Sequence, residues 1–233
     1  MHRRSIAVVA PMLALALIVG CSLDPDLVMA PRGWSAVQLS RDGVDSFRAH
    51  LEDDTMAVTA ADRNAATNSR MILLADDATS RRDTEACISF SDEGWPAQEG
   101  IALRVDTDAD DRTRAITVMK NVWAHAESSV NVLLWDTATP TAPQTIDSYV
   151  ATSVKDGDGF APNPWSMCAR TAGDDLTYMM WPSDQPQPSW DDMRTTRRTK
   201  LPESVPTSGT TGLYVGHVPP EATVQLTMLS GFD

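Results

Sequence analysis

The sequence predicts an all-β protein, a two-sheet antiparallel β-sandwich in a single domain. Apolar and polar residues alternate in several short segments, as in 101–105, where the odd positions would face a core. Turn-forming clusters of Asp and Gly separate these segments, for example at 106–111 and 156–159. The chain has 15 prolines, and most of them lie outside the apolar segments, as expected of a loop-rich β-protein.

The individual elements follow from this pattern. We expect ten strands, at residues 71–74, 86–90, 100–106, 115–122, 130–135, 145–154, 165–170, 176–181, 213–217 and 223–229. A helix is expected only around 44–50 or 55–65, and neither segment has a clear apolar face. The sequence shows no internal repeat. Short strands at intervals of about ten to fifteen residues favour one β-sandwich over two domains.

The N-terminal segment has the pattern of an export signal. Basic residues at the start precede an apolar run, 6–19, that is too short to span a bilayer. The run ends in Ile18-Val19-Gly20-Cys21, which resembles the lipobox of bacterial lipoproteins. This resemblance implies that residues 1–20 are a signal peptide and that Cys21 becomes a lipidated N-terminus. An ordinary secretory signal with an unrelated cysteine and an uncleaved anchor helix are the alternatives.

The lipoprotein interpretation also implies a location and a domain plan. Residues 21–33 would be a flexible tether, and residues 34–233 would form the β-sandwich domain. Membrane lipid attached to Cys21 would hold the protein at the extracytoplasmic face of the cell membrane. The chain carries 32 acidic and 19 basic residues, a net charge of −13. This balance argues against nucleic acid as a partner and against electrostatic binding to anionic lipid.

Cys87 and Cys168 are the two cysteines left when Cys21 is assigned to lipid. Both lie in apolar, strand-like segments of a chain expected in an oxidising compartment, where a disulfide persists. We therefore expect a Cys87–Cys168 disulfide. Two buried thiols or two metal ligands are the alternatives, although no CxxC pattern or nearby histidine accompanies either cysteine.

The C-terminal half resembles a known class of jelly roll. Residues 176–182 followed by the loop 185–190, with its alternating prolines and Trp190, are similar to a recurrent stretch of concanavalin A-like (laminin G-like) domains. The resemblance covers roughly residues 85–232 and implies a jelly-roll sandwich. It also implies one of three functions: glycoside hydrolase, sugar-binding module or protein-binding module.

Catalytic motifs are not evident in the sequence. Hydrolases of this architecture place Glu-x-Asp-x-Glu on one strand, and no two glutamates of the mature chain have that spacing. None of His50, His125 and His217 lies near a Gly-x-Ser-x-Gly elbow or a reactive cysteine. An enzyme with an aspartate-based site is thus the weakest of the hypotheses.

Tryptophans in loops are the candidate ligand contacts. Trp95 follows an acidic turn, and Trp190 precedes Asp191 and Asp192. Sugars stack on aromatic rings and bond to carboxylates, so these residues form a tentative glycan site, with structural packing as the alternative. The other tryptophans of the expected strands (Trp123, Trp135, Trp165 and Trp181) are assigned to the core.

Two acids, Asp156 and Asp158, lie in a tight turn and could bind a structural calcium ion; no other cofactor is expected. The sequence thus predicts a lipid-anchored, non-catalytic glycan-binding protein. The alternative is a structural or protein-interaction lipoprotein of the cell envelope without a sugar site.

Overall fold

The computed structural model describes residues 28–41, 45–62, 64, 68–92, 97–122, 128–139, 143–150, 155–156, 159–160 and 164–232. In this part of the chain all regular elements are strands, and no helix is long and apolar enough to cross a membrane. The strands are β1 (Val28–Met29), β2 (Trp34–Ser40), β3 (Phe47–Glu52), β4 (Thr55–Ala60), β5 (Arg70–Ala75), β6 (Thr84–Asp92), β7 (Gln98–Thr107), β8 (Thr113–Val122), β9 (Ser128–Asp136), β10 (Gln144–Val150), β11 (Lys155–Asp156), β12 (Gly159–Phe160), β13 (Trp165–Ala172), β14 (Asp175–Pro182), β15 (Thr196–Lys200), β16 (Thr210–Gly216) and β17 (Thr223–Ser230).

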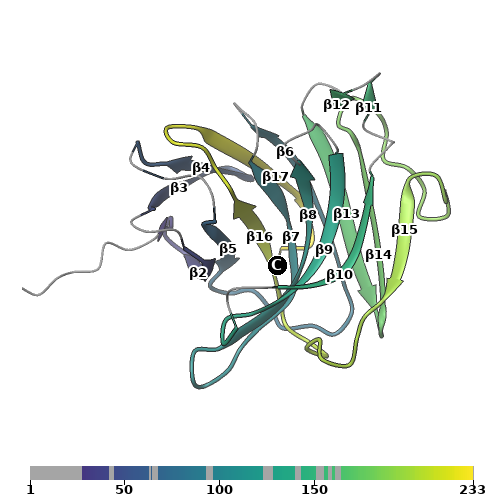
Figure 1. The fold of residues 1–233 in the computed structure, drawn as a ribbon, viewed down its shortest axis with the longest axis horizontal. Coiled ribbons are helices and arrows are strands. Elements are labelled where there is room, and N and C mark those ends of the chain that lie inside the picture. Colours follow the sequence, from purple (N-terminus) through teal and green to yellow (C-terminus); the bar gives the residue numbers. More distant parts are fainter. Residues whose placement is uncertain are drawn as a thin grey trace, which may run out of the picture.

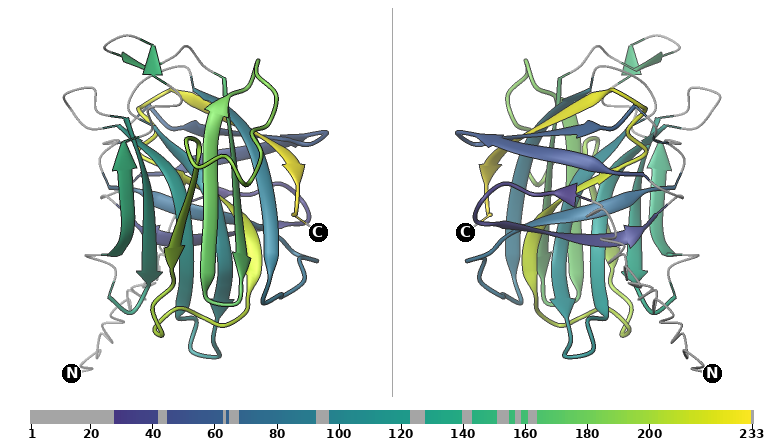
Figure 2. Two further views of the ribbon diagram at one scale, coloured as in Figure 1. Left: turned by 90° about the vertical axis from the view of Figure 1, so that its right-hand side faces the viewer. Right: turned by 90° about the vertical axis from the view of Figure 1, so that its left-hand side faces the viewer.

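Two large sheets form the sandwich (Figure 1). Sheet A has the strand order β1-β3-β4-β17-β6-β13-β14-β15, and sheet B has the order β10-β9-β8-β7-β16-β5-β2. All their pairings are antiparallel except β1 with β3. The short β11–β12 hairpin lies at one end of the molecule, beyond the ends of the long strands (Figure 2). The predicted two-sheet antiparallel sandwich is confirmed.

Each of the ten predicted strands overlaps a strand of the structure, but the predicted helix is wrong. The segments 44–50 and 55–65 contain β3 and β4, which pair with each other through the turn at Asp53, where φ is 51°. Their side chains alternate with period two, since Phe47 and Ala49 are buried on β3 and Met56, Val58 and Ala60 are buried on β4. Small apolar residues at these positions make the alternation weak in the sequence.

The folded domain also begins before the predicted boundary at residue 34. Val28 and Met29, assigned to the tether, form β1 and pair with Phe47 and Arg48 of β3. The side chain of Val28 is buried in the core between the sheets. Burial of this side chain explains why the chain is ordered here and does not continue as a tether.

The core between the sheets encloses an ion pair. Lys120 of β8 and Glu99 of β7 lie 2.8 Å apart, and their side chains are 2% and 0% exposed. The Lys120 ammonium also lies 5.1 Å from the centroid of the Trp165 ring. Both charges are desolvated, so loss of either partner would leave the other charge buried at a large energetic cost.

Sheet B is rich in β-bulges. Register shifts interrupt four of its six pairings, those of β2 with β5, β7 with β8, β16 with β7 and β10 with β9. Only one described pairing of sheet A, β17 with β6, has such a shift. A bulge increases the local twist of a strand pair. The bulges are therefore expected to add twist at four strand pairs of sheet B.

The bulge at Arg104 corrects one detail of the predicted alternation. Ile101 and Leu103 face the core between the sheets as expected, but Val105 lies in the apolar cluster on the other face of sheet B. Arg104 has a positive φ of 50°. The extra residue of the bulge places the side chains after it on the opposite face of the sheet from the one that strict alternation predicts. The Arg104 guanidinium donates to the carbonyl oxygens of Arg82, Pro206 and Gly173, which ties three loops together.

The predicted disulfide is confirmed. Cys87 of β6 and Cys168 of β13 are directly opposite each other on adjacent strands, with Cα atoms 4.1 Å apart. The sulfur atoms lie on the outer face of sheet A, in a cluster with Met179 and Trp181. The bridge therefore joins two central strands of sheet A that are 81 residues apart in the sequence.

The double substitution Cys87→Ala/Cys168→Ala is expected to lower the free energy of unfolding by roughly 3–5 kcal/mol, because the open chain gains conformational entropy when unfolded. Urea unfolding of parent and variant measures the effect. An unchanged unfolding midpoint would contradict the expectation, as would a non-reduced mass of the parent showing two free thiols at these positions.

Candidate functional site

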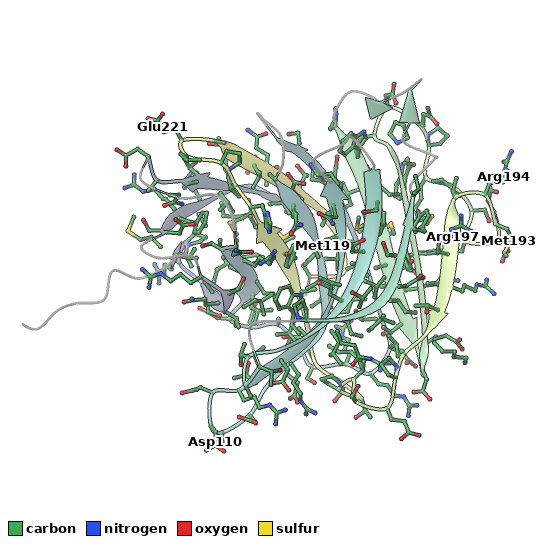
Figure 3. The ribbon with its side chains drawn as sticks, in the orientation of Figure 1. Asp110, Met119, Met193, Arg194, Arg197 and Glu221 are labelled. Atoms are coloured by element: carbon green, nitrogen blue, oxygen red, sulfur yellow. A yellow bond between two sulfur atoms is a disulfide. The ribbon has the colours of Figure 1, made fainter. Side chains whose placement is uncertain are left out.

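The outer face of sheet B, opposite the inter-sheet core, carries a second apolar cluster. It is built from side chains of β2, β5, β7, β8, β9 and β16: Leu39, Ile72, Ala102, Val105, Ala115, Met119, Leu133, Trp135 and Tyr214. Met119, which is labelled in Figure 3, belongs to this cluster. Trp135 is 2% exposed, and its indole Nε1–H donates to Thr117 Oγ1 at 2.9 Å. The predicted burial of Trp135 is confirmed, although the ring packs on the outer face of the sandwich.

A contact across this face reveals its shape. The Arg70 guanidinium of β5 lies 5.7 Å from the centroid of the Trp135 ring of β9, although three strands separate β5 from β9. In a flat sheet the two strands would be roughly 19 Å apart. The two residues are also offset along the strand direction. Arg70 is paired with Gly216 of β16, whereas the residues paired across the sheet with Trp135 lead to the region of Thr210 on the same strand. This offset of six residues adds about 20 Å of separation along the strands in a flat sheet. The contact therefore requires a sheet that curves around its outer face.

The curvature creates a pocket at the β2 edge of sheet B, which we call the edge pocket. Its volume is about 650 Å³. The described residues that line it are Gln38, Leu39, Ser40, Arg41, Asn68, Arg70 and Thr137. Thr137 follows β9, and four strands lie between β9 and β2 in the strand order of sheet B. Thr137 can therefore line the same pocket as the β2 residues only because the sheet is curved. Ligand sites in proteins have volumes in this range.

Hydrogen bonds fix the position of Arg70 in the edge pocket. Its Nη1 donates to Ser40 Oγ at 3.2 Å and to the carbonyl oxygen of Asn68 at 3.1 Å, and Ser40 Oγ also donates to that carbonyl. Arg41 differs from Arg70, because its Nε is buried without a hydrogen-bond partner among the described residues. The pocket thus combines one anchored guanidinium with one that lacks a protein partner at Nε.

Further hydrogen bonds between side chains join neighbouring strands of sheet B. Tyr214 Oη donates to Gln98 Oε1 at 3.0 Å, and Gln98 Nε2 donates to Asn121 Oδ1 at 2.7 Å. Farther along, Ser148 Oγ donates to Asn131 Oδ1 at 2.8 Å. Burial raises the pKa of Tyr214, so its hydroxyl remains a proton donor. These amides support each other and hold the neighbouring strands in register.

His217 borders the site, directly after β16. Its backbone N–H donates to the carbonyl oxygen of Ser69 at 3.2 Å, and its φ is 53°. Nε2 is buried without a hydrogen-bond partner in the described part of the chain. Burial, and next the positive charge of Arg70, lower the pKa of His217 to about 4. The folded protein therefore holds this imidazole neutral.

His217 is expected to make the protein less stable as the pH falls. In the unfolded chain its pKa is about 6.5, so between pH 6.5 and 4 the unfolded state binds a proton that the folded state excludes. Across this window the free energy of unfolding should fall by up to about 3 kcal/mol from this group. Asn tolerates a positive φ and does not titrate, so His217→Asn should flatten the dependence. Urea unfolding at pH 4–7 that shows equal slopes in parent and variant would contradict this assignment.

The sequence-predicted residues around Trp190 lie on the outer face of sheet A, away from the edge pocket. Trp190 is half-buried against the cluster that contains the disulfide, and the Arg170 guanidinium lies 4.2 Å from its ring centroid. Asp191 is exposed and lies 3.8 Å from Arg198. Asp192 accepts hydrogen bonds from Arg194, which lower its pKa to about 2. Arg194 itself projects from the molecule next to Met193 (Figure 3).

Other predicted site residues lie outside the described residues. These are the lipidation site Cys21, the loop residue Trp95 and Asp158 of the calcium proposal. Asp156 belongs to β11 by its backbone, and its side chain is not described. Within the described part of the chain, no three His, Cys, Asp or Glu side chains are grouped as metal ligands would be.

Comparison with known proteins gives a fold but no family. No protein-family model and no curated protein matches the sequence. A Bacillus subtilis protein of unknown function with a galectin-like fold matches the structure with a TM-score of 0.54 and 9% identity, over 85% of this chain and 90% of its own. The Ca2+-bound exoplasmic/lumenal domain of VIP36 matches with a TM-score of 0.47 and 12% identity, over 85% and 84%. The match to the Bacillus subtilis protein indicates that the chain has a galectin-like β-sandwich fold.

Proposed function

We propose that this protein binds glycans, and that it does so in the edge pocket on the outer face of sheet B. The observation that carries the proposal is the lining of the pocket. Gln38, Asn68, Ser40 and Thr137 contribute amide and hydroxyl groups, which donate and accept hydrogen bonds as sugar hydroxyls do. Leu39 also lines the pocket, but its side chain is buried in the apolar cluster of this face.

The lectin-like fold supports this proposal, because the pocket lies on a curved sheet of the sandwich. The proposal is limited to binding. Glycoside hydrolysis uses a pair of carboxyl groups, and none of the described lining residues is an aspartate or a glutamate. Trp190, Asp191 and Asp192 stay a second, sequence-based prediction of ligand contacts, on the other sheet.

We further propose that a lipid on Cys21 carries the domain at the extracytoplasmic face of the cell membrane. The support is the order of residues 3–21: basic residues, an apolar run and a small residue before the cysteine. A lipidated N-terminus close to Val28 would place the sandwich near the membrane surface. A glycan ligand would then belong to the cell envelope or to the surroundings of the cell.

The substitution Gln38→Ala is expected to weaken glycan binding about fivefold, the effect of losing one net hydrogen bond of about 1 kcal/mol. Gln38 is exposed, so the fold should be unaffected. Gln225→Ala is the matched control, because Gln225 is an exposed strand glutamine of sheet A. A glycan array probed with the detergent-purified protein identifies the ligand, and titration of that ligand measures the affinities.

Two results would count against the proposed site or function. Equal affinities of Gln38→Ala and Gln225→Ala would remove the site from the edge pocket. Failure of the parent to bind any glycan would contradict the proposed function and leave the interaction lipoprotein as the better hypothesis.

The substitution Cys21→Ala is expected to abolish membrane anchoring, because no thiol remains to accept the lipid. The protein should move from the membrane fraction to the soluble fraction, or accumulate with residues 1–20 attached. Mass spectrometry and fractionation check this. A variant with the same fractionation and the same mass, apart from the substitution, would show that Cys21 is not modified.

A further inference from the structure

We propose that the glycan bound in the edge pocket is acidic, and that Arg41 and Arg70 bind its carboxylate or sulfate group. This inference rests on the proposed function and adds the class of ligand. It begins from an imbalance of charge: the chain has 13 more acidic than basic residues, yet the described residues lining the pocket include two arginines and no carboxylate.

Seven of the 13 other Arg and Lys side chains in the described part of the chain have carboxylate partners. Ion pairs join Arg112 with Asp136, Arg114 with Asp106, Lys120 with Glu99, Arg170 with Glu85, Arg194 with Asp192, Arg198 with Asp191 and Lys200 with Asp175. Arg41 and Arg70, like six other described arginines, form no ion pair with a described carboxylate, but these two line the same pocket. The edge pocket is thus a place where two positive charges line one concave surface without compensation from the described residues.

The contacts of Arg70 preserve its charge for a ligand. Its partners are neutral: Ser40 Oγ, the carbonyl oxygen of Asn68 and the π face of Trp135. These interactions restrict the guanidinium to one position without neutralising it. A preorganised guanidinium loses little conformational entropy when it binds a planar anion through two parallel hydrogen bonds.

Arg41 supplies the complementary observation. It is adjacent to Ser40 in the chain, and its Nε–H is buried without an acceptor among the described residues. A buried donor without an acceptor is costly, and an oxygen of a bound anion would satisfy it. An anion in the edge pocket would therefore compensate the positive charge of the two arginines and also accept a hydrogen bond from Arg41 Nε–H.

The test compares one sugar with and without its charge. The full-length protein in detergent is titrated with tetragalacturonate and with its fully methyl-esterified form, which keeps the sugar and removes the negative charges. A carrageenan tetrasaccharide, sulfated and free of carboxyl groups, distinguishes sulfate from carboxylate as the preferred anion. We expect the better of the two acidic ligands to bind about tenfold or more tightly than the neutral ester.

Substitutions then assign the charge to the pocket. Arg41→Gln and Arg70→Gln should each weaken binding of the acidic ligand about tenfold, and should weaken binding of the neutral ester by a smaller factor. Arg48→Gln is the control, since Arg48 is exposed on β3 of sheet A and its loss changes the net charge equally. If near-UV circular dichroism shows that Arg70→Gln is misfolded, Arg41→Gln alone decides.

The outcomes separate this inference from the function on which it rests. If neither acidic ligand binds more tightly than the neutral ester, or if Arg41→Gln has unchanged affinity for the preferred acidic ligand, the inference is overturned and glycan binding is left intact. An equal loss in Arg48→Gln also overturns it, because the effect would then come from net charge. Failure to bind any glycan, charged or neutral, ends the proposed function itself.

Discussion

The curvature of sheet B is the constraint on which the candidate site depends. Arg70 and Trp135 lie on strands that are separated by three others, and they are in contact because the outer face of the curved sheet is concave. The bulges supply this curvature, since each one adds a residue to one strand of a pair and increases the twist. In a flat sheet Thr137 would be far from Gln38, and the two would line no common pocket.

The same irregularities also organise the rest of the sandwich. The bulge at Arg104 moves Val105 to the outer cluster and directs the guanidinium of Arg104 toward the carbonyl oxygens of three loops. Sheet A, which has a single bulge among its described pairings, carries the disulfide between directly opposed cysteines. The chain thus combines one regular, cross-linked sheet with one curved sheet that holds the pocket.

Much of the fold could be predicted from the sequence, because inward-facing apolar residues at every second position mark the strands. The alternation fails where it is weak or interrupted. β3 and β4 have small residues such as Ala49 and Ala60 at inward positions, so the sequence of these two strands does not show a clear alternation. A bulge is the insertion of one residue and has no compositional signature, so the side of the sheet that Val105 occupies could not be predicted.

The edge pocket could not be predicted for a different reason. Its residues come from three segments, 38–41, 68–70 and 137, and none of the three has a motif. Only the curvature brings them together. Trp190 is singled out by its loop, which is rich in proline and acidic residues, yet its side chain is partly buried against the disulfide cluster. The unpaired arginines would become a signal only once the ion pairs of the chain were known.

One measurement tests the central claim most directly, that ligand binds on the curved outer face of sheet B. The seven tryptophans give separate indole N–H signals in a ¹⁵N NMR spectrum, and a titration with the tightest-binding glycan shows which of them respond. We expect the Trp135 signal to shift, because Arg70 lies over its ring, and the Trp190 signal on sheet A to stay in place. A shift of Trp190 with Trp135 unchanged would place the ligand on the opposite sheet and contradict the account.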